Sequence, residues 1–151
     1  MRRQDLALSA EESLVIVDQV QFAVLSLVDE AGRPYGVPLD YVRRGMALYF
    51  HGAREGRKVR AMQQNPLGCA VIIGENEIIP EKLGRHYKTV IVEGKIELID
   101  DPDEKRRVMT WVVERKSPDY MERGQKVIEK MLDRVLVYKM NMEVVSGKHG
   151  L

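Results

Sequence analysis

The sequence is poor in the features that would place it outside the cytoplasm or in a membrane. Cys69 is the only cysteine among 151 residues, which excludes an intrachain disulfide and a metal cluster built from several cysteines. The longest apolar runs, such as LVIV and AVII, fall far short of the roughly 20 residues that cross a bilayer. The N-terminal MRRQDLALSAEE also lacks the apolar core of a signal peptide. We therefore expect a cytoplasmic protein that makes no contact with membranes.

The sequence also has almost no net charge. Lys and Arg total 24 against 23 for Asp and Glu, a net charge of +1, so nothing draws the chain as a whole toward nucleic acid. Its length and its 44% hydrophobic content predict one globular domain over residues 1–151. No second His, Cys or carboxylate stands at ligand spacing from a histidine, so we expect no metal site.

Apolar stretches separated by turn residues predict mainly β structure. The predicted strands are 21–29, 34–44, 46–52, 67–74, 87–100 and 133–148. The first two read as a hairpin closed around Gly32, and a second turn ends in Gly45. Gly94 suggests a bulge or sharp bend in the fifth strand, and residues 75–86 read as an irregular polar loop. Antiparallel strands of this number favour a small barrel, because closure removes exposed edges.

Three helices are expected around these strands. Ser9 and Glu12 have the spacing of a capping box and predict a short first helix. A second short helix begins after Gly56 and stops at Asn65-Pro66. A third, over residues 100–116, opens with Asp-Pro and carries apolar residues at helical spacing.

The stretch YFHGAREGRK, residues 49–58, raises the question of a ligand. A strand that passes through Gly56 into a helix offers free amides and the positive end of that helix to an anion, and Arg57 and Lys58 add charge there. The alternative is that Arg54, Arg57, Lys58 and Arg60 form a solvated helix face. The motif is neither a Walker loop nor a G-x-G-x-x-G turn.

The order of three motifs carries a family resemblance. VPLDYV, LYFHGAREGRKVRAMQQNP and YKTVIVEGK occur in the order and at the spacing seen in flavin-binding split-barrel proteins related to pyridoxamine 5'-phosphate oxidase. The chain resembles this family, and within it the nitroimidazole-resistance (Nim-like) group, from MRRQD to the SGK at 146–148. The resemblance implies an α+β, mainly β fold: a six-stranded antiparallel split β-barrel with peripheral helices. It also implies a homodimer with FMN at the subunit interface.

The resemblance also implies a set of site residues. Arg57 and Lys58 would contact the FMN phosphate, and Thr89 would donate its hydroxyl to it. His51 would stand close to the flavin as the catalytic candidate, although a lone histidine is more often a structural residue. The cofactor-binding residues implied in this way are Val37, Pro38, Leu39, Asp40, Tyr41, His51, Gly52, Ala53, Gly56, Arg57, Lys58, Tyr87, Thr89 and Val90.

The sequence departs from the family pattern at three places. Gly52 stands where the Nim-like group often has serine, and Asp40 replaces the more usual Asn or Ser beside the flavin. Such a carboxylate would either disfavour the anionic reduced flavin or point to solvent. The C-terminal segment lacks the Arg- and Trp-bearing stretch with which the true oxidases grip pyridoxal phosphates, so the resemblance does not extend to oxidation of vitamin B6.

The resemblance implies an FMN-dependent oxidoreductase that reduces a small electron-poor substrate such as a nitroaromatic, with the flavin supplying the chemistry. Two alternatives stay open at this point. One is a related split barrel that uses the deazaflavin F420. The other is a flavin carrier or sensor without turnover of its own.

Overall fold

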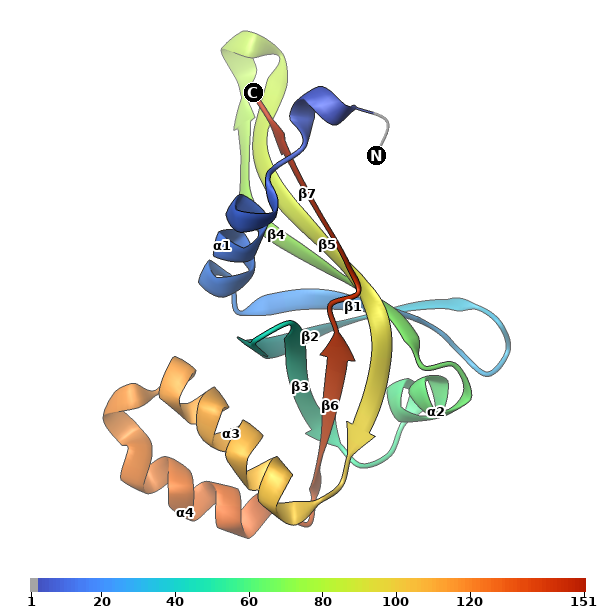
Figure 1. The fold of residues 1–151 in the computed structure, drawn as a ribbon, viewed down its shortest axis with the longest axis vertical. Helices are drawn as coiled ribbons and strands as arrows, with labels where there is room; N and C mark the ends of the chain where they lie inside the picture. Colours follow the sequence, from blue (N-terminus) through green and yellow to red (C-terminus); the bar gives the residue numbers. More distant parts are fainter. Residues whose placement is uncertain (1–2) are drawn as a thin grey trace.

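The computed structural model describes residues 3–151, so Met1 and Arg2 of the predicted domain lie outside the described residues. Within this range seven strands form one antiparallel sheet in the order β4-β1-β2-β3-β6-β5-β7, and β4 also pairs with β5 (Figure 1). That pairing closes six strands into an uneven ring and leaves β7 outside it. The predicted split barrel, mainly β with peripheral helices, is confirmed.

The strands are β1 (Phe22–Val28), β2 (Pro34–Arg44), β3 (Ala47–Ala53), β4 (Leu67–Ile79), β5 (Gly84–Ile99), β6 (Val135–Asn141) and β7 (Val144–Gly150). The α-helices are α1 (Ala10–Gln19), α2 (Arg57–Gln64), α3 (Pro102–Lys116) and α4 (Met121–Met131). Short 3-10 turns are η1 (Gln4–Leu6), η2 (Pro80–Lys82) and η3 (Pro118–Tyr120).

The helix caps and the glycine turns lie where the sequence predicted them. The Ser9 hydroxyl accepts from the amide of Glu12 at 3.1 Å, and the Glu12 carboxylate accepts from the amide of Ser9 at 2.8 Å, which completes the capping box. The Asp101 carboxylate caps α3 by accepting from the amide of Glu104 at 2.8 Å. Gly32 and Gly45 both have positive φ, 74° and 57°, at the turns that join β1 to β2 and β2 to β3.

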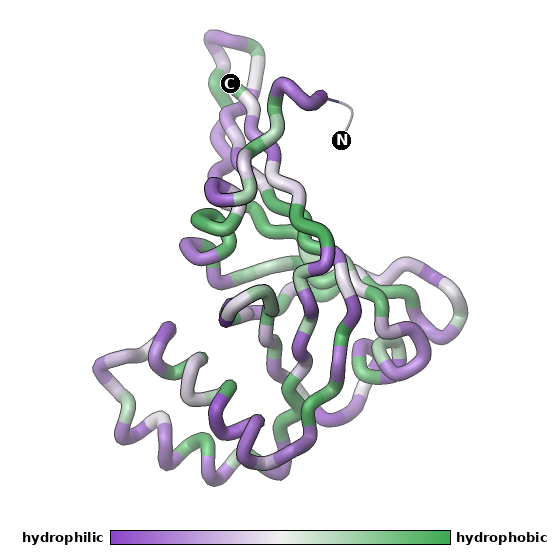
Figure 2. Tube along the Cα trace, viewed as in Figure 1, coloured by the Kyte–Doolittle hydropathy of each residue, from purple (hydrophilic) through white to green (hydrophobic). Residues whose placement is uncertain are grey.

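The core lies inside the ring. Its largest fully buried side chains come from several strands and include Leu25, Leu48, Phe50, Ile72 and Tyr138. Figure 2 shows the hydrophobic segments gathered where the strands cross in the middle of the molecule. Along β3 the side chains alternate: Leu48 and Phe50 join this core, whereas Tyr49 packs with Trp111 of α3 on the outer face.

The prediction of an irregular loop over 75–86 is wrong. β4 and β5 continue through this segment as a paired arm that turns at η2 (Figure 1). Polar cross-strand pairs hold the arm together: Glu75 accepts from Lys88 at 2.9 Å and also contacts His86. Because both faces of a projecting arm meet solvent, its strands lack the apolar alternation that marks a half-buried strand.

The last predicted strand, 133–148, is two strands. The first, β6, pairs with Ile96–Ile99 at the end of β5. The second, β7, pairs with Tyr87–Glu93 earlier in β5. Gly94 lies at this crossing, where an added Cβ would be 1.8 Å from the carbonyl oxygen of Asn141. The β4–β5 register runs unbroken through Gly94, and the irregularity falls at Ile73/Glu75 instead. Gly94 thus permits a close backbone approach and does not mark a bulge in that pairing.

The helix α4 was not predicted. It packs against α3 as an antiparallel pair beside the outer face of β3 and β6 (Figure 1). No helix within residues 3–151 has the length and apolar character needed to cross a membrane.

Candidate functional site

The turn between β3 and α2 presents unsatisfied backbone amides. Gly56 is the N-cap of α2, with φ 119° and ψ 176°, a conformation that side chains rarely adopt. Its carbonyl accepts from the amides of Val59 and Arg60, both at 3.1 Å. Within residues 3–151 the amides of Arg57 and Lys58 have no acceptor, as expected for the first turn of a helix. The positive end of α2 is therefore available to an anion.

Ion pairing separates the basic residues of this turn into two kinds. Arg54 pairs with Asp100 at 2.6 Å, Arg57 with Asp29 at 2.7 Å and Arg60 with Glu30 at 2.5 Å. Lys58 has no carboxylate within ion-pair distance in the described part of the chain. The predicted alternative, a solvated basic face, fits the three arginines but does not explain a half-buried, unpaired Lys58.

Lys58 lies against Gly52 at the end of β3. A Cβ added to Gly52 would come within 3.0 Å of Cε and 3.1 Å of Nζ of Lys58. It would also lie 2.6 Å from the hydroxyl oxygen of Tyr138. The absence of a side chain at Gly52 therefore makes the space in which the Lys58 ammonium sits.

Arg57 is held in another direction. Its guanidinium donates to Asp29 at 2.7 Å and stacks over the ring of Tyr35, 4.2 Å from the ring centre. Hydrogen bonds from the amide of Arg33, and then from the Arg57 side chain, lower the pKa of Asp29 to about 2. Asp29 thus ties the β1–β2 turn to Arg57, the first residue of α2.

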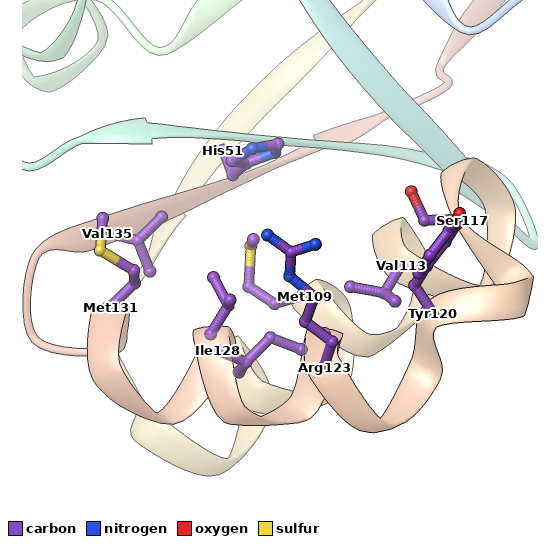
Figure 3. Close-up of a pocket in the computed structure, with 11 residues that line it drawn as sticks. His51, Met109, Val113, Ser117, Tyr120, Arg123, Ile128, Met131 and Val135 are labelled. Carbon is purple, nitrogen blue, oxygen red and sulfur yellow. The ribbon is translucent and has the colours of Figure 1, made fainter.

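His51 faces the opposite side of β3 from this turn. It lines a cavity between β3, β6 and the α3–α4 pair, and burial, followed by the charge of Lys116, lowers its pKa (Figure 3). The imidazole is therefore neutral at pH 7, with one nitrogen able to donate a hydrogen bond and the other able to accept one.

Asp40 does not simply point to solvent, which was one of the two roles that the sequence left open. Its half-exposed carboxylate forms an ion pair with the ammonium of Lys116 at the end of α3. The negative charge beside His51 is thus neutralised, and the pair links β2 to α3.

The structure brings only part of the predicted set together. Val37–Tyr41, His51–Ala53 and Gly56–Lys58 lie on neighbouring elements, β2, β3 and the start of α2. The stretch of β5 that pairs with β7 holds Tyr87, Thr89 and Val90 and runs toward the opposite end of the molecule from α2 (Figure 1). Within one chain these two groups do not form one site.

Two of the predicted residues have side chains in the core. The Tyr41 hydroxyl donates to the carbonyl of Val17 at 2.7 Å, and burial raises its pKa. Val90 is completely buried. Either residue can reach a ligand only through its backbone.

The sequence interpretation missed the other residues that line the His51 cavity, most of which lie on α3 and α4. The missed residues are Met109, Val113, Ser117, Tyr120, Arg123, Gly124, Val127, Ile128, Met131 and Val135. The spacing of Gly124, Ile128 and Met131 is that of one helix face, and Pro118 marks the break after α3. That signal predicts a helix but not the cavity, which needs α4 to fold back on α3.

The fold and the β3–α2 turn define a class, the split-barrel proteins, and the sequence agrees. Residues 9–149 match the pyridoxamine 5'-phosphate oxidase family, and the chain belongs to it. A comparison with curated proteins found no match.

Three solved structures illustrate the similarity. A candidate 5-nitroimidazole antibiotic resistance protein from Bacteroides thetaiotaomicron is 21% identical, with a TM-score of 0.77 over 95% of this chain and 86% of that one. The flavocytochrome Anf3 from Azotobacter vinelandii is 23% identical, with a TM-score of 0.84 over 100% and 72%. An FAD-binding protein from Mesorhizobium loti is 26% identical, with a TM-score of 0.70 over 96% and 97%. The first two similarities show the fold alone.

Proposed function

We propose that the protein binds FMN as a homodimer and uses it to reduce a small electron-poor molecule of the nitroaromatic kind. The observation that carries the proposal is Lys58, the unpaired cation beside the free amides of the α2 turn. The family membership and the similarity to an FAD-binding protein support a flavin as the ligand. As the sequence predicts, we place this activity in the cytoplasm.

The turn fits the terminal phosphate of FMN. Lys58 supplies a positive charge, the amides of Arg57 and Lys58 supply donors, and Gly52 leaves room for the Lys58 ammonium beside them. Hydrogen bonds between ionised groups are stronger than neutral ones, so Lys58 would contribute most of the phosphate affinity. In this proposal Arg57 positions the turn through Asp29 and does not hold the phosphate with its side chain.

The proposed dimer accounts for the two groups of predicted residues. Thr89 and Tyr87 are half-buried on the part of β5 that lies away from α2, so they would reach the flavin from a second copy of the chain. The site is then incomplete in a monomer, and cofactor binding and dimer formation would stabilise each other.

The proposed chemistry divides between the cofactor and His51. Bound FMN would supply reversible two-electron transfer. His51 is neutral at pH 7, and its ring N–H can donate a hydrogen bond to an oxygen of the acceptor and hold it in place. The Asp40–Lys116 pair beside it limits the charge that the reduced flavin would meet.

Titration of flavin-free protein tests the proposal. Binding is followed by the loss of flavin fluorescence. We expect FMN to bind more tightly than riboflavin or FAD, because only FMN ends in a phosphate monoester. Lys58→Met should weaken FMN binding about 10- to 100-fold and leave riboflavin unchanged. Lys130→Met, which removes an exposed charge from α4, is the control and should leave both affinities unchanged.

The same measurement separates the alternatives. Equal affinity of the parent for FMN and riboflavin would refute the phosphate site, and preferential binding of F420 would replace FMN as the cofactor. Anaerobic mixing of dithionite-reduced holoprotein with nitrobenzene then tests turnover. A flavin that stays reduced would identify a carrier or sensor.

A further inference from the structure

The cavity next to His51 is large enough for a small molecule. It encloses about 550 Å³ and lies between the outer face of β3 and β6 and the inner faces of α3 and α4. Small-molecule sites of proteins span roughly 300 to 1,000 Å³ and combine an apolar lining with a few polar groups. This cavity, which we call the α3–α4 cavity, has that composition.

Most of its wall is apolar. Met109 and Val113 come from α3, Ile128 from α4 and Val135 from β6, and their side chains surround the space in Figure 3. At its mouth Val127 and Met131 remain 51% and 44% exposed. A molecule with an apolar body would remove this surface from water, which stabilises a complex by roughly 25 cal/mol per Å².

One charged side chain enters this wall. Figure 3 shows the guanidinium of Arg123 directed from α4 toward His51. Arg123 has no ion pair or hydrogen-bond partner within residues 3–151. Arg54, Arg57 and Arg106, by contrast, each pair with a carboxylate. The cavity lining contains no Asp or Glu.

The position of Arg123 is unfavourable for the helix that carries it. It lies in the first turn of α4, where the positive end of the helix dipole repels a cation. The neighbouring Glu122 is taken by Lys126 at 2.6 Å. Arg123 is exposed, so water solvates part of its side chain. Helix stability gives no reason for a cation at this position, whereas an anion in the cavity would.

We propose that the α3–α4 cavity binds a small, mainly aromatic or aliphatic molecule that carries one carboxylate. Arg123 holds the carboxylate, since its planar fork of N–H groups matches the two carboxylate oxygens. The apolar body packs against Met109, Ile128 and Val135. A single guanidinium next to a neutral imidazole suits one negative charge better than the nearly two charges of a phosphate monoester.

Binding to this cavity does not depend on the flavin. If FMN lies beside His51, then the carboxylate-bearing molecule is the electron acceptor, and this identification of the substrate class rests on the proposed function. Arg123 would then hold its carboxylate on the side of the cavity that faces His51.

Two matched probes test the binding. 2-Naphthoate and 2-naphthamide have the same two-ring body, and only the first carries a charge. Calorimetric titration of each into flavin-free and FMN-saturated protein gives the affinity ratio of the pair. We expect naphthoate to bind more tightly, and Arg123→Met to weaken it about 10- to 100-fold without changing naphthamide.

Arg134→Met is the control. Arg134 is exposed, lies outside the cavity lining and has no ion pair in the described chain, so the same substitution there should preserve the ratio. Three results would each overturn the proposal. The two probes could bind equally, Arg123→Met could leave the ratio unchanged, or neither probe could bind because a second copy fills the cavity. Because flavin-free protein is titrated as well, a failure to bind FMN would not be mistaken for any of these results.

Discussion

Replacing Gly52 with alanine tests the packing that positions Lys58. The new Cβ would lie 2.6 Å from the Tyr138 hydroxyl oxygen, and real Cβ atoms essentially never show contacts under 3.0 Å. The tyrosine must therefore shift, although it is fully buried. Overpacking of this kind costs about 1 to 3 kcal/mol, and each kcal/mol lowers the Tm of a chain of this size by about 2 to 4 °C. We expect a Tm lower by about 2 to 12 °C.

The same substitution should weaken FMN binding, because the new Cβ also touches Lys58 at 3.0 and 3.1 Å. Gly36→Ala in β2 is the matched control. Its Cβ would meet only Cγ1 of Val24 at 3.4 Å, an ordinary contact, so its Tm and FMN affinity should stay at the parent values. Thermal unfolding and FMN titration on the same preparations measure both effects.

A second substitution shows whether the tyrosine oxygen is the cause. Tyr138→Phe removes the 2.6 Å contact together with a 3.3 Å hydrogen bond to the carbonyl of Ala53. Gly52→Ala should therefore cost less stability in the Tyr138→Phe background than in the parent. A parent-like Tm for the single alanine variant, or the same loss in both backgrounds, would refute the reasoning.

Three further predictions concern His51 and the dimer. His51→Ala should retain FMN but lose reduction of nitrobenzene per bound flavin, and an unchanged rate at full occupancy would remove its catalytic role. Because burial lowers the His51 pKa from 6.5, the folded state favours the neutral form, so acidification below pH 6.5 should lower the Tm of the parent more than that of His51→Gln. Thr89→Val should weaken FMN binding about 2- to 10-fold. We expect light scattering to show a dimer, and a monomer that holds FMN tightly would contradict the proposed interface.

The sequence by itself determined the features that depend on a few neighbouring residues. The Ser9–Glu12 capping box, the Asp-Pro start of α3 and the turn at Gly56 are local hydrogen-bonding and backbone preferences, and the structure has each of them. Strands of the ring were predictable because one face of each meets the core. The order and spacing of three motifs, one of them around residues 49–58, carried the family resemblance, and the match over 9–149 confirms the family.

Only the tertiary structure decided what depends on distant segments. The 75–86 arm is held by cross-strand pairs between polar residues, for which no periodic apolar pattern exists. Arg57 and Lys58 are adjacent in sequence. Asp29, 28 residues before Arg57, pairs with Arg57 and leaves Lys58 unpaired. Arg123 became a candidate because α4 folds back on α3 and directs it toward His51. Pairing partners across such distances are set by the packing of the whole chain, which local preferences do not encode.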